Sequence, residues 1–190
     1  MRSALIALVV LVAGIAAADV CDVAGVARVG GRPQENAIVW LEASGGLPEL
    51  GEQKRYVLDQ RNLGFVPQVL VVPVVATVEF PNNDRVFHNV FSFKDGKRFD
   101  LGLYPIGTVK HVRFDKPGLS RVFCNIHPAM AAYVMVVDTP YFAISDEDGR
   151  FMVRGVPAGS YTYHAWRPGG ATLTDSVAIA PGSELEVRWP

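Results

Sequence analysis

The segment Cys124-Asn125-Ile126-His127-Pro128-Ala129-Met130 carries a thiol, an imidazole and a thioether at intervals of three residues. A second imidazole, His88, lies well before it in the chain. Two imidazoles and one thiolate with a weak axial Met form the ligand set of a blue-copper electron-transfer site. Thiolate and thioether favour Cu(I) and imidazole suits Cu(II). These residue types therefore predict a metal site that accepts both oxidation states of copper.

The fourth ligand has to come from another element. His88 follows the strand-like run Thr77–Phe80 and the turn Pro81-Asn82-Asn83-Asp84. The loop can supply three ligands, Cys124, His127 and Met130, and the fourth, His88, is distant in the sequence. The site can therefore form only once the domain has folded. Cys124 must bind as the thiolate, which is the metal-ligating form of the side chain.

Several other interpretations of these residues stay open. A Met often just fills a core, and a Cys-His-His pocket also suits zinc. Cys21 is the only other cysteine and could pair with Cys124 in an oxidising compartment. We expect instead that Cys124 is a ligand and that Cys21 stays unpaired.

The rest of the sequence offers no catalytic group. His111 and His164 lie in strand-like runs without other ligand types, so we expect structural or surface roles for them. Asp146-Glu147-Asp148 lacks the further oxygen ligands of a calcium loop. No phosphate-binding loop or nucleophile motif occurs. We therefore expect an electron carrier, not an enzyme. The net charge of −1 argues against nucleic acid as a partner.

The amino terminus reads as a secretory signal peptide over residues 1–18. Arg2 is followed by the apolar run Ala4–Ile15 and by Ala16-Ala17-Ala18 before Asp19. The apolar run is shorter than the roughly 20 residues of a membrane span. We expect a periplasmic or otherwise exported protein without stable membrane insertion after cleavage.

The elements that must hold the site are short strands, because no segment has a helical period. Frequent turns between β-favouring runs predict an all-β sandwich or barrel. Asp95-Gly96 and Gly102 are expected in turns. The strand candidates are residues 23–29, 37–41, 55–60, 69–72, 76–80, 86–93, 108–114, 121–124, 133–137, 141–144, 151–153, 161–166, 176–179 and 184–189.

Residues 56–138 resemble the cupredoxins, which form a Greek-key β-sandwich. The resemblance rests on the runs 65–72 and 77–84, on His88-Asn89-Val90 and on the Cys124 loop, whose Cys-x-x-His-x-x-Met spacing looks most like that of amicyanins. The family usually has a glycine in the turn at residues 73–76, and this chain has none.

The resemblance implies one mononuclear type 1 copper bound by His88, Cys124, His127 and Met130. It also implies that Asn89 acts as a hydrogen-bonding clasp near the ligand loop and that Pro128 stiffens the loop. The ring edge of His127 would reach the surface among Ile126, Ala129 and Phe87, where a redox protein would dock transiently.

The end of the chain resembles the transthyretin-like, carboxypeptidase-regulatory type of sandwich. Asp146-Glu147-Asp148-Gly149-Arg150-Phe151 and Val156-Pro157-Ala158-Gly159-Ser160-Tyr161 carry this resemblance, and Gly31-Arg32-Pro33 and Ala37-Ile38-Val39 add to it. We expect a discontinuous domain of residues 22–46 and 139–190 with the cupredoxin domain inserted. Alternatively, the first two strands extend the cupredoxin sheet.

These patterns favour an exported type 1 copper protein that transfers one electron at a time. Two alternatives remain: a periplasmic copper-binding or delivery protein, and a structural β-sandwich binding module with a vestigial metal site.

Overall fold

The computed structural model describes residues 19–44, 54–93 and 95–190. Every regular element within them is a strand, so the predicted all-β class is confirmed. No described segment forms a helix that could cross a membrane. The predicted signal peptide, residues 1–18, lies outside the described residues.

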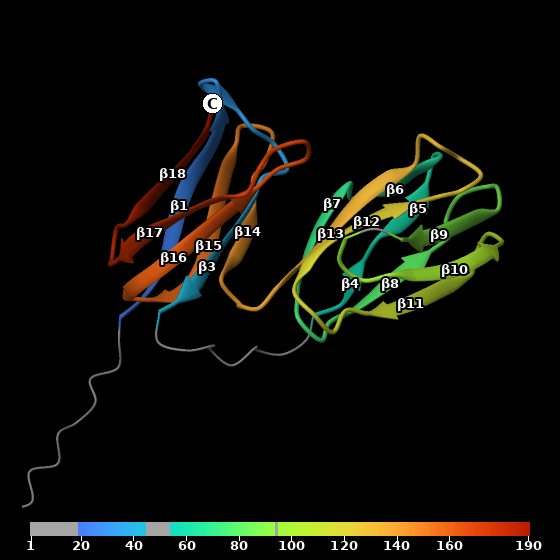
Figure 1. Ribbon diagram of the computed structural model, residues 1–190, viewed down its shortest axis with the longest axis horizontal. Helices are drawn as coiled ribbons and strands as arrows, with labels where there is room; N and C mark the ends of the chain where they lie inside the picture. The colour runs from blue at the N-terminus through green and yellow to red at the C-terminus, as the bar shows by residue number, and fades with distance from the viewer. Residues whose placement is uncertain (1–18, 45–53, 94) are drawn as a thin grey trace, which may run out of the picture.

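The strands form two β-sandwiches that lie side by side (Figure 1). The first sandwich contains β1 (Val20–Val29), β2 (Arg32–Pro33), β3 (Ile38–Ala43), β14 (Phe142–Ile144), β15 (Arg150–Pro157), β16 (Gly159–Trp166), β17 (Leu173–Ile179) and β18 (Glu184–Trp189). The second contains β4 (Tyr56–Val57), β5 (Asp59–Arg61), β6 (Gly64–Val66), β7 (Val69–Pro73), β8 (Thr77–Pro81), β9 (His88–Ser92), β10 (Phe99–Tyr104), β11 (Val109–Arg113), β12 (Gly118–Phe123) and β13 (Ala131–Val137).

The first sandwich joins the two ends of the chain. Its sheets have the orders β15-β1-β18 and β14-β3-β16-β17. Val39 of β3 lies opposite Ala143 on one side and Ala165 on the other. Among the described residues, β1 and β3 pair with no strand of residues 56–138. We propose the domain limits 22–46 with 139–190, and 56–138, on this pairing.

The second sandwich supplies the site. Its larger sheet has the order β10-β9-β12-β13-β7, and β11-β8-β4 lies opposite. Alternation along the strands directs one face of each sheet into a shared core. Phe80, Val90 and Val122 in this core are fully buried. This packing holds the central strands in place: β9 begins at the predicted ligand His88, and β12 ends directly before Cys124.

Two connections differ from what the sequence suggested. Residues around Gly102 were expected in a turn, but they belong to β10, which contains an irregularity between Asp100 and Leu103. Gly102 has a φ of 63° there, a left-handed conformation that occurs in one type of β-bulge and that glycine adopts without penalty. In the turn at residues 73–76, which lacks a glycine, Val75 adopts a φ of 64°.

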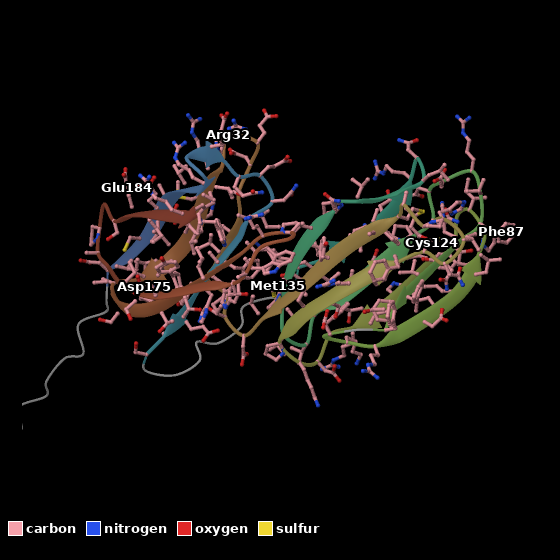
Figure 2. All side chains as sticks on the ribbon, turned by 45° about the horizontal axis from the view of Figure 1, so that its top comes forward. Arg32, Phe87, Cys124, Met135, Asp175 and Glu184 are labelled. Atoms are coloured by element: carbon pink, nitrogen blue, oxygen red, sulfur yellow. The ribbon has the colours of Figure 1, made fainter. Side chains whose placement is uncertain are left out.

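A third apolar cluster joins the two sandwiches. It contains Ile38 and Trp166 of the first sandwich and Val71, Met135 and Val137 of the second. Tyr133 and Trp166 contact edge to face with ring centroids 5.1 Å apart. Figure 2 shows Met135 at this junction and Cys124 toward the far end of the second sandwich.

Candidate metal centre

The start of β9 and the loop between β12 and β13 bring the predicted ligands together. His88 opens β9, Cys124 directly follows β12, and His127 lies in the loop that leads into β13. β12 is hydrogen-bonded to both β9 and β13, with Phe123 opposite Phe91 and Ala131. The sheet therefore places Cys124 beside residues that are distant in the sequence.

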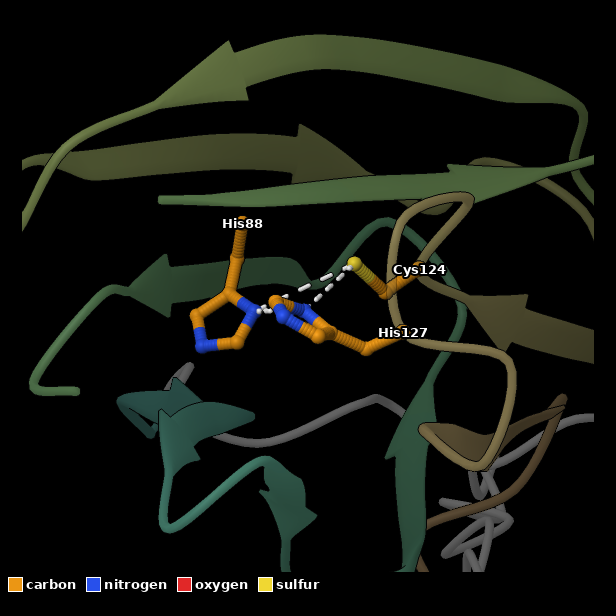
Figure 3. Close-up of side chains that lie close together, drawn as sticks. All are labelled: His88, Cys124 and His127. Atoms are coloured by element: carbon orange, nitrogen blue, oxygen red, sulfur yellow. Dashed lines mark hydrogen bonds between the residues drawn. The ribbon is translucent and has the colours of Figure 1, made fainter. Parts of the chain in front are cut away.

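The ligand atoms of these residues converge on one point (Figure 3). Nδ1 of His127 lies 3.0 Å from Nδ1 of His88 and 3.6 Å from Sγ of Cys124. Sγ of Cys124 lies 3.9 Å from Nδ1 of His88. All three atoms lie within 4.8 Å of one another, and no other such cluster occurs among the described residues.

These separations fit ligands of a single ion. Metal–nitrogen bonds of about 2.0–2.1 Å and metal–sulfur bonds of about 2.3 Å place tetrahedral ligand atoms about 3.4 Å (N to N) and about 3.6 Å (N to S) apart. The observed sides of 3.0, 3.6 and 3.9 Å match that triangle. The donor set of thiolate and imidazole suits copper, and zinc fits it too.

The centre is largely closed to water. His88 is fully buried, Cys124 is 3% exposed and Met130 is 1% exposed, whereas His127 is half-buried. Met130 belongs to the same apolar core as Cys124, and its backbone N–H donates to the carbonyl of His127 at 2.9 Å. Among these four side chains, only that of His127 is partly exposed to solvent.

Asp84 fixes the ring of His88, and the sequence interpretation missed this role. Its Oδ2 lies 3.0 Å from Nε2 of His88. The backbone N–H of Leu63, and then those of Arg85 and the His88 ring, hold the pKa of Asp84 at about 2. The carboxylate is therefore ionised and only accepts, so Nε2 of His88 is the donor in this contact and Nδ1 faces the cluster.

The signal for Asp84 was present in the sequence, since an acidic residue four positions before a ligand His can reach its outer nitrogen. The only role predicted for Asp84 was a place in the turn of residues 81–84. Its Oδ1 accepts the N–H of Arg85 and its Oδ2 that of Leu63, so the turn and the His88 contact use the same side chain.

Asn89 contacts the ligand loop from β9, and Pro128 lies within the loop. Asn89 is buried, and its Oδ1 accepts the N–H of Asn125 at 3.4 Å. Pro128 is exposed in the turn between His127 and Met130, and it contributes a fixed φ and no N–H there. Both residues therefore restrict the conformation of the segment that follows Cys124.

The remaining candidates lie outside the cluster. Cys21 is free, as is Cys124, and its Sγ contacts the carbonyl of Val156 in the first sandwich. His164 stacks on Trp40 with ring centroids 5.0 Å apart. Cys21 and Cys124 form no disulfide with each other and belong to different sandwiches.

Comparisons with known proteins find two groups. The carboxypeptidase regulatory-like domain family matches residues 127–189. A purple cupredoxin from Nitrosopumilus maritimus is 26% identical, with a TM-score of 0.40, over 43% of this chain and 99% of that one. These are the two families that the sequence motifs resemble.

Two further solved structures are similar. A point mutant of amicyanin in its reduced state is 20% identical over 54% of this chain and 100% of that one, with a TM-score of 0.40. A copper-containing nitrite reductase from Thermus scotoductus is 23% identical over 60% of this chain, with a TM-score of 0.43, and the match spans 28% of the reductase. No curated protein matches the chain.

Proposed function

We propose that this protein is an exported type 1 copper protein that transfers single electrons. One observation carries the proposal: two imidazole nitrogens and one thiol sulfur, contributed by β9 and by the loop between β12 and β13, lie within 4.8 Å of one another. A bound copper ion would supply the chemistry by changing between Cu(II) and Cu(I).

The chain would contribute a ligand arrangement that changes little on electron transfer. His88 presents Nδ1 while Asp84 holds Nε2, so its tautomer and ring orientation are set beforehand. Cys124 is held at the end of β12, and the turn before Met130 holds His127. Ligands fixed by a packed core suit both oxidation states without rearrangement.

Met130 would be the weak axial ligand. It is 1% exposed, lies in the same apolar core as Cys124, and is tied to His127 through its backbone. Long axial bonds tune the redox potential in sites of this kind more than they hold the metal. Replacing Met130 by Leu should therefore change the potential and leave copper bound.

Electrons would enter and leave through the half-buried His127. Ile126, which precedes His127 in the chain, is 48% exposed, and Phe87, which precedes His88, is 53% exposed. Ala129 is exposed as well. Exposed apolar side chains of this kind fit a small, transient interface with a redox protein. We propose such a partner and an exported location.

Titration of the purified protein with Cu(II) tests the function. A charge-transfer band between thiolate and copper should appear in the visible spectrum at one equivalent of Cu(II). Cys124→Ser should abolish that band, and the matched control Cys21→Ser should retain it. A colourless wild-type protein would reject the assignment, as would equal copper binding by Cys124→Ser.

Metal analysis and voltammetry separate the alternatives. Zinc in the natively purified protein would indicate a zinc site. Bound copper without a reversible one-electron wave would indicate storage or delivery. Reversible oxidation and reduction with copper retained is the result expected for an electron carrier.

A further inference from the structure

The carboxylate of Asp100 on β10 is hydrogen-bonded to the side-chain amide of Asn89 on the neighbouring strand β9. Nδ2 of Asn89 donates to Oδ1 of Asp100 at 2.8 Å. An ionised carboxylate only accepts hydrogen bonds, so Asp100 can bind only the NH₂ end of the amide. The carbonyl end of Asn89 is thereby directed to the other side, where Oδ1 meets the N–H of Asn125.

The backbone of β10 also holds the Asp100 carboxylate in position. The pairing of β10 with β9 is irregular between Asp100 and Leu103, and Gly102 has a φ of 63°. In this conformation the N–H of Gly102 donates to Oδ1 of Asp100 at 2.8 Å. The same oxygen therefore accepts from the backbone of its own strand and from Asn89.

Asn125 connects this arrangement to the ligand loop, because it directly follows Cys124. Asn89 is only 2% exposed, whereas its two hydrogen-bond partners, Asp100 and Asn125, are both exposed. Turning the amide over would set its NH₂ group against the N–H of Asn125, and both groups are donors. The carboxylate of Asp100, which lies outside the cluster, thus determines which atom of Asn89 faces the N–H of Asn125.

We propose that Asp100 is a positioning residue that holds the loop after Cys124 through Asn89. Its effect on the loop does not require a metal. Its effect on the copper–thiolate bond rests on the proposed function.

Amide hydrogen exchange in the metal-free protein tests the proposal. In Asp100→Ala, the N–H of Asn125 should exchange at least threefold faster, while amides in the centres of β12 and β13 keep their rates. Asp100→Asn should restore the wild-type rate, because the N–H of Gly102 holds its amide oxygen toward Asn89. Asp115→Ala is the control, since Asp115 is exposed and pairs with Lys97.

An unchanged Asn125 rate in Asp100→Ala would overturn the proposal. Equal acceleration throughout β12 and β13 would also overturn it, because that result indicates general destabilisation. With copper bound, the thiolate-to-copper band should shift in Asp100→Ala and stay in place in Asp100→Asn. If Cys124 binds no copper, the proposed function fails, and the exchange rates still decide the role of Asp100.

Discussion

His88 uses its two ring nitrogens for different purposes. Nε2–H donates to Asp84, and Nδ1 faces Cys124 and His127. A ligand His that donates its other N–H to a carboxylate has a fixed tautomer and a more basic free nitrogen. Asp84 should therefore affect metal binding, although its carboxylate contacts only the ring nitrogen of His88 that faces away from the cluster.

Asp84→Asn tests this contact. Three N–H groups, from Leu63, Arg85 and His88, are shared by the two carboxylate oxygens. An amide has only one acceptor oxygen, so at least one donor would lose its partner. We expect copper affinity to fall by about 10- to 100-fold, measured by competition with a chelator of known affinity.

The control for this variant is Asp115→Asn, which removes an exposed carboxylate paired with Lys97. It should leave the copper affinity unchanged. Wild-type affinity in Asp84→Asn would show that the ring of His88 is oriented by the surrounding core alone.

At this scale the sequence was informative where ligand type and spacing coincide. Cys124 and His127 are three residues apart in one loop, so their convergence could be predicted. The contact of Asp100 with Asn89 could not, because it depends on where a neighbouring strand places a single nitrogen. For Asp84 the only signal was its position four residues before His88.

The connections between strands contain local strain that can be measured. Val75 links β7 to β8 with a φ of 64°. Left-handed conformations cost ordinary L-residues about 1–2 kcal/mol, and asparagine tolerates them better. We expect Val75→Asn to raise the free energy of unfolding by about 0.5–1 kcal/mol, measured by urea denaturation.

Val74→Asn is the matched control for this turn. Val74 packs against the core of the second sandwich, so a polar residue there should lower the free energy of unfolding. If Val75→Asn also lowers it, the contacts of the Val75 side chain outweigh its backbone strain.

Gly25 shows a different constraint, in the middle of β1. A Cβ atom at this position would collide with the ring of Phe151 and with the backbone carbonyl of Leu185. The carbonyl belongs to the paired strand β18 and cannot move independently. We expect Gly25→Ala to lower the free energy of unfolding by about 1–3 kcal/mol, the range for overpacked cores.

Gly159→Ala serves as the comparison, because a Cβ there would lie 3.7 Å from the ring of Tyr161. That separation is an ordinary contact, so little change is expected. Equal effects of the two substitutions, measured by thermal and urea unfolding, would contradict the packing argument for Gly25.

Most strands could be predicted from their apolar alternation, and β10 is the informative exception. Gly102 indicated a turn, but its left-handed φ belongs to a bulge inside a strand. Turns and bulges use the same residue types. Pairing with the neighbouring strand decides whether such a residue lies in a turn or a bulge, and the local sequence does not reveal that pairing.

In the whole molecule, the candidate metal centre lies far from the junction between the two sandwiches. Cys124 lies toward one end of the second sandwich and Met135 at the junction (Figure 2). Motifs at both ends of the chain resemble a single type of sandwich, which suggested that these ends pair, as β3 and β14 do. The packing of Trp166 against Tyr133 could not be foreseen, since no motif links these two residues.

The junction should make the two sandwiches unfold together. Trp166 is 6% exposed and lies in the cluster that joins them. Domains move independently unless their interface is large and apolar, and removing a buried Trp side chain costs about 3–5 kcal/mol. We therefore expect one calorimetric transition for the wild type and two for Trp166→Ala, with the copper–thiolate band unchanged because the metal centre is remote.

Trp189→Ala distinguishes loss of coupling from loss of stability. Trp189 lies in the core of the first sandwich, away from the junction cluster. Its replacement should lower the transition temperature of the coupled molecule without splitting the transition. A single transition in Trp166→Ala would mean that the remaining junction residues, Ile38, Val71 and Met135 among them, suffice to couple the sandwiches. A shifted copper–thiolate band in that variant would mean that the junction influences the ligand loop through β13, the strand that connects them.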